Sequence, residues 1–143
     1  MAPASGPSML PTFELLGEWL VVSKSHRLGR NISVGDLVVY NIPINEEFGV
    51  KRVLGMPGDY VLMDTPEYGN SDENNTHHNM IQVPQGHCWI VGDNLPASRD
   101  SRVFGPVPLA LIRGKVIASM IPFSGFKWIK NPLQKAEESS LQT

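Results

Sequence analysis

Apolar residues occur in short runs along the chain, and glycine, proline or polar residues separate one run from the next. Six runs have the length and the β-branched and aromatic content of strands, and they span residues 18–23, 36–40, 48–54, 60–63, 87–91 and 115–121. The run at 36–40 is apolar on both faces, which predicts a well-buried strand. Short strands between Gly/Pro turns predict a mostly β protein, an antiparallel β-barrel or sandwich. Little helix is expected beyond a turn at 109–112 and another near the C-terminus.

The segment 55–59 (GMPGD) contains two glycines and a proline, which is the composition of a tight turn. We therefore expect the strands on either side of it, 48–54 and 60–63, to form a hairpin. Residues 64–79 are rich in Asn, Asp and Glu, which predicts an exposed, mobile loop. No repeat or linker divides the chain, so we expect one domain over residues 1–143, with its core in 5–130 and a flexible tail in 131–143.

Composition narrows the function classes. Of the 143 residues 41% are hydrophobic and 18% are charged, which excludes a disordered chain. Twelve Lys and Arg residues against fourteen Asp and Glu residues give a net charge of -2, which argues against a general nucleic-acid binder. The single cysteine, Cys88, excludes an intrachain disulfide and a multi-cysteine zinc site, and we expect neither a metal nor a cofactor. No apolar run is long enough to span a membrane.

Ser8 and Lys51 are the first two candidates for chemistry. Ser8 lies between Pro7 and Pro11, so a rigid loop can hold its hydroxyl and backbone N–H in place; the segment is equally compatible with a flexible N-terminal tail. Strand alternation places Lys51 on the same face as Val53, a face where lysine is unusual without a partner or a task. The alternative is a lysine that protects an edge strand from aggregation.

The loop 92–102 (GDNLPASRDSR) is the third candidate, because it is dense in polar residues and directly follows a buried strand. Asp100 and Arg102 are spaced to form an ion pair that pins this loop. Ser98 is expected to hydrogen-bond close to Lys51. Taken alone, the loop is also compatible with an ordinary Asn/Asp/Ser turn.

Together these segments resemble the type I signal peptidase family, the membrane-bound serine proteases with a Ser-Lys dyad. The resemblance lies in the segments SMLPT (8–12), GDLVV (35–39), KRVLGMPGD (51–59) and GDN (92–94), followed by Ser98, Asp100, Ser101, Arg102 and Gly105. The motifs occur in the family's order and cover residues 5–121, and the family's β-fold agrees with the strand pattern. The chain is short, and the residues around Gly92–Leu95 and Arg102 make it most similar to the mitochondrial inner membrane branch, to its subunit 1 group rather than its subunit 2 group.

The resemblance implies that Ser8 is the nucleophile and Lys51 the general base. A free lysine has a pKa of about 10.4 and is protonated at neutral pH, so desolvation must lower the pKa of Lys51 before it can act as a base. The family pattern further implies that Ser98 hydrogen-bonds the Lys51 amine and orients it. The Asp100–Arg102 pair would hold the loop that carries Ser98.

The family pattern also makes the backbone N–H of Ser8 the main oxyanion-hole donor. In Gram-negative members a serine two positions before the nucleophile supplies a second donor. Gly6 occupies that position here, which leaves the second donor unassigned.

By resemblance, we expect a serine endopeptidase that removes sorting presequences from proteins of the mitochondrial inner membrane and intermembrane space. Its expected partners are presequence-bearing substrates, a second peptidase subunit and a membrane surface, and its expected location is the inner membrane, facing the intermembrane space. The alternative is a catalytically inactive β-domain that only assembles with a partner. A self-cleaving repressor-type protease needs an N-terminal DNA-binding domain, and the seven residues before Ser8 leave no room for one.

Two terminal features belong to this expectation. Family members usually carry a membrane-spanning helix just upstream of the nucleophile, so we expect this chain to be a shortened form of an anchored enzyme, through truncation, an incomplete gene model or splicing. Near the other end, residues 126–130 (FKWIK) are compatible with contact to a membrane surface and with packing as a terminal segment.

Overall fold

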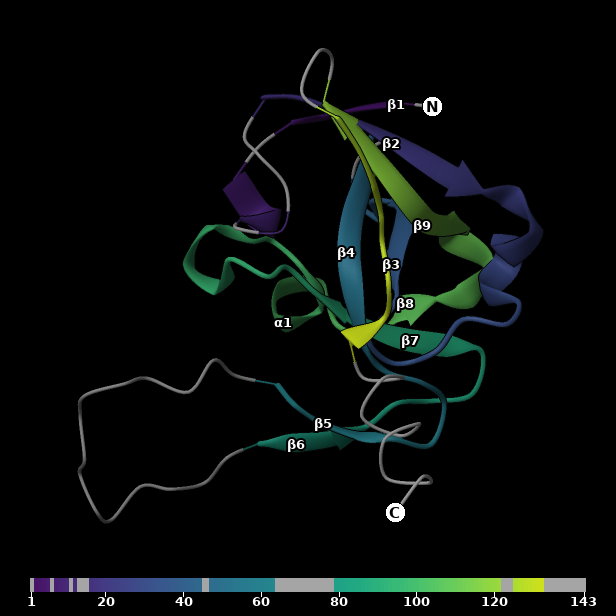
Figure 1. The fold of residues 1–143 in the computed structure, drawn as a ribbon. Coiled ribbons are helices and arrows are strands. Elements are labelled where there is room, and N and C mark those ends of the chain that lie inside the picture. The colour runs from purple at the N-terminus through teal and green to yellow at the C-terminus, as the bar shows by residue number, and fades with distance from the viewer. Residues whose placement is uncertain are drawn as a thin grey trace, which may run out of the picture.

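Antiparallel strands are the main regular structure of the described residues, as the sequence predicts (Figure 1). The structure is a computed structural model that describes residues 2–5, 7–10, 12, 16–44, 47–63, 79–121 and 125–132. The strands are β1 (Ala2–Ser5), β2 (Leu16–Ser23), β3 (Leu37–Asn41), β4 (Phe48–Gly55), β5 (Tyr60–Leu62), β6 (Met80–Gln82), β7 (His87–Val91), β8 (Val107–Pro108), β9 (Ile112–Ile121) and β10 (Gly125–Trp128). Short helical segments connect them: the 3-10 helices η1 (Pro7–Met9), η2 (Lys24–Gly29), η3 (Leu95–Ala97) and η4 (Leu109–Leu111), and one α-helical turn, α1 (Ser101–Phe104).

The main sheet has the strand order β1-β2-β9-β3-β4-β7-β8, with β10 paired to β9. The long strand β9 connects the two halves of this sheet. Strand β2 pairs with one edge of β9, while β3 and β10 pair with successive segments of β9. The register shifts between Val21 and Val22 and between Val39 and Tyr40 mark bulges in the strands beside β9. Bulges of this kind bend a sheet, which lets one strand serve several partners.

All six predicted strands are present, but the predicted hairpin is wrong. The tight turn exists, with Asp59 accepting from the Met56 N–H at 2.9 Å. However, β4 pairs with β3 on one edge and with β7 on the other, so neither edge is open to β5. Instead β5 pairs with β6 in a separate two-stranded sheet, which Figure 1 shows beneath the main sheet.

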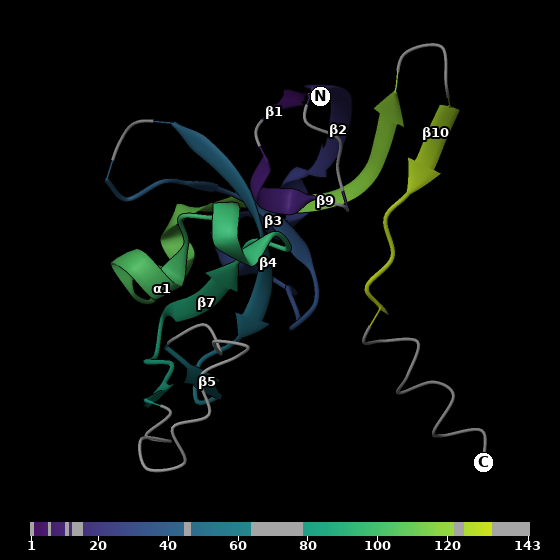
Figure 2. The same ribbon diagram turned by 90° about the vertical axis from the view of Figure 1, so that its left-hand side faces the viewer.

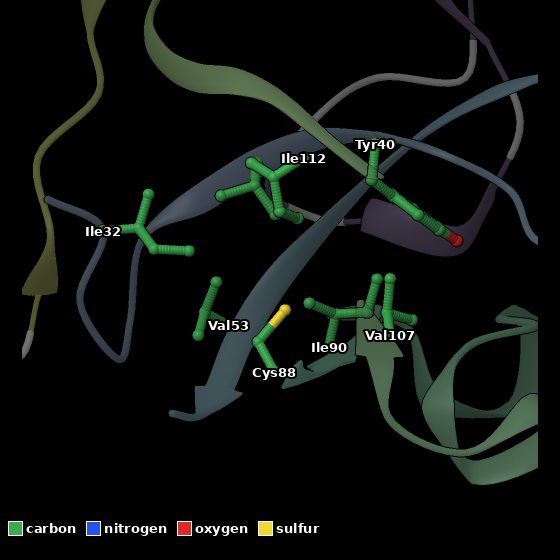
Figure 3. Close-up of a cluster of buried hydrophobic side chains, with 8 residues drawn as sticks. Ile32, Tyr40, Val53, Cys88, Ile90, Val107 and Ile112 are labelled. Carbon is green, nitrogen blue, oxygen red and sulfur yellow. The ribbon is translucent and has the colours of Figure 1, made fainter. Parts of the chain in front are cut away.

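The core consists of clusters of buried side chains packed against the main sheet. One cluster of buried side chains is shown in Figure 3 and consists of Ile32, Val38, Tyr40, Val53, Cys88, Ile90, Val107 and Ile112. Cys88 is fully buried there, and burial raises the pKa of its thiol to about 12, so it is a packing residue. A second cluster contains Met9, Leu20, Leu37 and Val116, and it ties the segment that carries Ser8 to the sheet.

The structure tests only part of what the sequence predicts for the loop at 64–79, the C-terminal tail and the helical turns. Asn131 was expected in the tail but is buried, and its side-chain amide donates to Val34 O and to Asp36 Oδ1, so the ordered core extends to this residue. The expected loop at 64–79 (apart from its last residue), the tail after residue 132 and its helical turn lie outside the described residues, whereas the turn expected at 109–112 is η4.

The segment FKWIK contributes a strand, β10, rather than an irregular end. Phe126 and Trp128 remain exposed on it, and their rings pack edge to face with centroids 4.9 Å apart. Across the described ranges, we find no helix with the length and apolarity needed to cross a membrane.

Candidate active site

Ser8 occupies a short helical turn that is anchored on both sides. Pro7 begins η1, and the Met9 side chain inserts into the second core cluster with only 4% of its surface exposed. The loop after β7 supplies further anchors: the Asn94 N–H donates to Ser8 O at 2.9 Å, and the Asn94 side-chain amide donates to Pro7 O at 3.0 Å. Figure 2 shows η1 in front of β4, beside this loop. The turn that carries Ser8 is therefore anchored to the core and to the loop after β7, as expected of a segment that holds its hydroxyl in place.

Lys51 lies in the middle of β4, between β3 and β7, so it is not on an edge strand. Its neighbours on the same face, Val53 and Gly55, are buried, as the strand alternation predicts. The Lys51 side chain is only 6% exposed. Its Nζ lies 2.8 Å from Ser8 Oγ and donates to Val50 O at 3.1 Å. The fold thus brings together two residues that are 43 positions apart in the chain.

Burial lowers the pKa of Lys51 below its ordinary value, because an ammonium group loses hydration there. The Asp100 carboxylate opposes this effect, since a nearby negative charge favours the protonated lysine. The desolvation effect is the larger of the two. The site therefore makes the neutral amine, the form that can accept a proton from a hydroxyl at hydrogen-bonding distance, easier to reach than in a free lysine.

Asp100 is fully buried and is the centre of the loop 92–102. Its carboxylate accepts hydrogen bonds from the Gly92 N–H at 3.0 Å, from Ser98 Oγ at 2.7 Å and from Arg102 Nε at 2.9 Å. Burial by itself raises the pKa of Asp100, but these hydrogen bonds outweigh it and hold the pKa below its usual range. The predicted Asp100–Arg102 ion pair is confirmed, and it closes the loop against the end of β7.

The expected hydrogen bond between Ser98 and Lys51 is absent from the structure. Within the described residues, the Ser98 hydroxyl donates to Asp100, while Lys51 Nζ bonds to Ser8 and Val50. The Asp100 carboxylate is the stronger acceptor because it is ionised and fully buried. Ser98 therefore reaches Lys51 only indirectly, through the carboxylate whose charge acts on the amine.

At Gly92 the loop packs tightly against the segment that carries Ser8. A Cβ atom at this position would lie 2.2 Å from Ser98 Oγ and 2.6 Å from the Ser8 carbonyl oxygen. Both separations are far below van der Waals contact. Only glycine therefore lets the residue after β7 lie this close to both the Ser8 carbonyl and the Ser98 side chain.

Arg52 and Asp93 form a second support that the sequence analysis did not assign. Arg52 Nε and Nη2 donate to the two Asp93 carboxylate oxygens at 2.9 and 2.8 Å, and Nη1 donates to Gly35 O at 2.7 Å. Asp93 also accepts from the Thr12 hydroxyl, and its N–H points to Met9 Sδ. The sequence signal that could have identified this pair was the position of Arg52 beside Lys51 and of Asp93 beside Asn94. Strand alternation, however, places Arg52 on the opposite face from Lys51.

The part of the chain that the structure describes contains no group of three or more His, Cys, Asp or Glu side chains that could hold a metal ion. The site brings together a serine hydroxyl, a lysine amine and nearby backbone groups. In the first turn of a helix, N–H groups lack intrahelical acceptors, and the Ser8 N–H lies in such a turn.

A family model described as "Signal peptidase, peptidase S26" matches residues 2–70 and 63–121. The matched region contains all the candidate site residues described above. The chain belongs to the signal peptidase family, peptidase S26. Mitochondrial inner membrane protease subunit 1 of Schizosaccharomyces pombe is 44% identical over 90% of this chain and 76% of that protein. Its human counterpart is 37% identical over 88% of this chain and 72% of that protein.

A crystal structure of a signal peptidase I from Enterococcus faecalis overlaps 61% of this chain and 97% of its own, with 25% identity and a TM-score of 0.49. A further relative in the signal peptidase family is mitochondrial inner membrane protease subunit 2 of Schizosaccharomyces pombe, 42% identical over 63% of this chain and 46% of that protein. The similarity therefore extends to relatives named for both subunits.

Proposed function

We propose that this chain is a serine endopeptidase in which Ser8 is the nucleophile and Lys51 the general base. The observation that carries the proposal is the 2.8 Å contact between Lys51 Nζ and Ser8 Oγ at a lysine that is 6% exposed. A hydroxyl becomes an effective nucleophile when a base within hydrogen-bonding distance takes its proton, and lysine serves this role only when its pKa is lowered.

In the proposed reaction, Ser8 Oγ attacks the carbonyl carbon of the scissile peptide bond while its proton passes to Lys51 Nζ. The tetrahedral intermediate collapses as the C–N bond breaks, and Lys51 returns the proton to the departing amine. Water then attacks the acyl carbon on Ser8 and gives a proton to Lys51. Lys51 returns this proton to Ser8 Oγ as the acyl C–O bond breaks, which releases the new carboxyl end and regenerates the hydroxyl. The Ser8 N–H is proposed as one donor to the oxyanion. A second donor is not assigned.

Ser98, Asp100 and Arg102 are proposed as positioning residues. Asp100 links the other two and also sets the charge that Lys51 experiences, so all three act on the amine through one carboxylate. This replaces the direct Ser98–Lys51 hydrogen bond that the family pattern implies.

The substrates and location are proposed from the relatives, which are named as mitochondrial inner membrane protease subunits. We infer that the chain works at the mitochondrial inner membrane, facing the intermembrane space, together with a second subunit. There it would remove presequences from imported proteins. An extended substrate adding a strand to a sheet edge would place its scissile bond by backbone hydrogen bonds.

A processing assay tests this proposal. A presequence peptide is incubated in detergent with the chain, with and without its partner subunit, and the products are identified by mass. Ser8→Ala and Lys51→Met should each lower kcat/KM by at least about a thousandfold. Ser25→Ala and Lys127→Met are the matched controls at exposed positions and should leave the rate unchanged. If either active-site variant is folded and cleaves the peptide at the full rate, the dyad is refuted. If neither the wild-type chain nor its complex with the partner subunit cleaves the peptide, the inactive assembly subunit is favoured.

A further inference from the structure

A basic cavity of about 430 Å³ lies outside the candidate active site. It is formed by η2, η4 and the adjoining ends of β3 and β9, and none of its lining residues contributes to the Ser8–Lys51 site. In Figure 1 the blue segment that follows β2 lies at the right-hand side of the molecule, whereas purple η1 lies on the left. The cavity is therefore separate from the proposed chemistry.

The cavity concentrates positive charge in a chain that carries a net charge of -2. Four of its lining residues are Lys24, Arg27, Arg30 and Arg113, and none is acidic. Among the described residues, the ion pairs involve other cations, so no carboxylate there neutralises Lys24, Arg27 or Arg30. Like charges that are gathered without counter-charges repel one another, and a bound anion relieves that repulsion.

A tight turn places two of these arginines side by side. The Arg30 N–H donates to Arg27 O at 3.3 Å, and the two residues between them have positive φ, 60° at Leu28 and 73° at Gly29. The ends of such a turn lie within about 7 Å of each other. A Cβ at Gly29 would lie 2.6 Å from Leu109 Cδ2, so the turn is packed tightly against η4. The two guanidinium groups are thus attached to a fixed backbone.

Arg113 enters the cavity from β9 and is also held in place. Its Nε donates to Asn41 Oδ1 at 3.2 Å, and its guanidinium lies 5.2 Å from the centre of the Phe48 ring. Planar guanidinium forks match the oxygens of a phosphate group and bind it by paired hydrogen bonds. Three arginines from two separate elements therefore supply the donors that a phosphate requires.

Leu28 adds an apolar component at the same place. It lines the cavity, it is 54% exposed, and it occupies a left-handed conformation that costs a residue with a Cβ about 1–2 kcal/mol. A free phosphate offers nothing for an exposed leucine to contact. A phospholipid offers both a phosphate and an adjoining apolar region. We infer that this cavity binds the headgroup phosphate of an anionic phospholipid, with Leu28 contacting the apolar part of the lipid.

Vesicle binding tests the charged part of this site. The full chain is mixed with phosphatidylcholine vesicles that contain or lack phosphatidic acid, and the bound fraction is measured by flotation. The wild-type chain should prefer the anionic vesicles, and Arg27→Gln/Arg30→Gln should weaken binding about 25-fold, at about fivefold for each charge near the surface. Arg99→Gln removes one exposed charge elsewhere and should lose far less than the roughly fivefold expected for Arg27→Gln alone. Equal losses in Arg27→Gln and Arg99→Gln, or no preference for anionic vesicles, would overturn the site.

Leu28→Asn separates the lipid from a free phosphate. Asn tolerates the left-handed conformation better than Leu, so this variant should melt no lower than the wild type. It should bind inorganic phosphate as the wild type does in a calorimetric titration, yet bind anionic vesicles more weakly. Two outcomes would assign the cavity to a soluble anion and overturn the lipid inference. One is full vesicle binding by Leu28→Asn, and the other is a wild-type chain that binds phosphate but not vesicles. Peptide cleavage in solution should be unchanged in every one of these variants.

Discussion

The backbone N–H of Asn94 donates to the carbonyl oxygen of Ser8 at 2.9 Å, so the loop after β7 holds the residue proposed as the nucleophile. This contact joins segments that are far apart in the sequence. It also requires the turn of η1 to lie directly against Gly92, where a side chain would have no space. The position of the Ser8 hydroxyl therefore depends on the loop as much as on the residues next to Ser8.

Gly92→Ala should displace Ser8 and abolish activity. The new Cβ would meet Ser98 Oγ at 2.2 Å and Ser8 O at 2.6 Å, and overpacking of this kind typically costs about 1–3 kcal/mol. Urea denaturation and peptide cleavage measure the two effects. The double variant Gly92→Ala/Ser98→Gly relieves the side-chain clash but not the one with Ser8 O. It should regain part of the stability without regaining cleavage, and an active single variant would contradict the proposed role of the contact.

Arg52→Lys should slow cleavage although the positive charge is kept. A lysine amine cannot reproduce the paired hydrogen bonds to Asp93 together with the one to Gly35 O, so the support beneath Met9 and Asn94 loosens. We expect kcat to fall about tenfold, equivalent to about 1.4 kcal/mol, with a smaller change in KM. Arg99→Lys, at an exposed arginine, is the control. Unchanged kcat in Arg52→Lys would show that the ion pair has no positioning role.

Lys51→Met should inactivate the enzyme and stabilise its fold. Burial penalises the charged amine, and the variant removes that penalty, so at pH 7 the free energy of unfolding should rise by about 1 kcal/mol. The sign follows from proton linkage. The folded pKa of Lys51 lies below the unfolded value of about 10.4, so the wild-type chain gains stability as pH rises between the two. The advantage of the variant should therefore shrink at alkaline pH, as urea titrations across pH would measure, and an advantage that grows with pH would contradict this assignment.

Asp100→Asn should shift the pH dependence of the remaining activity. In the proposed reaction the neutral amine is the active form of Lys51, so kcat/KM should rise with pH through the pKa of this lysine. The Asp100 charge raises that pKa, and removing it should move the rise to lower pH. The rate itself should also fall, because the Gly92 and Ser98 donors lose an ionised acceptor. A pH–rate profile of kcat/KM measures both effects. A rise that stays at the wild-type pH would show that Asp100 does not influence the base.

Arg102→Met should destabilise the fold by about 3 kcal/mol at neutral pH, because it leaves the buried Asp100 charge without its cation. The pKa of Asp100 lies below its usual range in the folded state. Its stabilising effect is therefore present above the unfolded pKa of about 3.9 and is lost as pH falls through the folded value. The difference in the free energy of unfolding between the wild type and Arg102→Met should therefore become smaller at acidic pH. Arg99→Met should show neither effect, and an Arg102→Met variant as stable as the wild type would contradict the role of the pair.

Strand positions followed directly from the sequence, whereas strand partners did not. The alternation around Lys51 and the doubly apolar run at 36–40 correctly predicted which faces are buried, because side-chain direction along a strand is a local property. The hairpin prediction failed because pairing depends on which edges other strands already occupy. The short strands β1, β6, β8 and β10 were missed because two to four residues carry too little periodicity to be distinguished from a loop.

Local order along the chain predicted a mostly antiparallel β fold and the Asp100–Arg102 pair, and the family motifs pointed to Ser8 and Lys51. These depend on alternation, on motif spacing and on charges that are two positions apart. Only the tertiary structure decided that Lys51 Nζ lies 2.8 Å from Ser8 Oγ, that Ser98 bonds to Asp100 instead of to Lys51, and that Arg52 pairs with Asp93. The physical reason is competition. Each buried donor and acceptor takes the strongest partner within reach, and only the folded chain determines which partners are within reach.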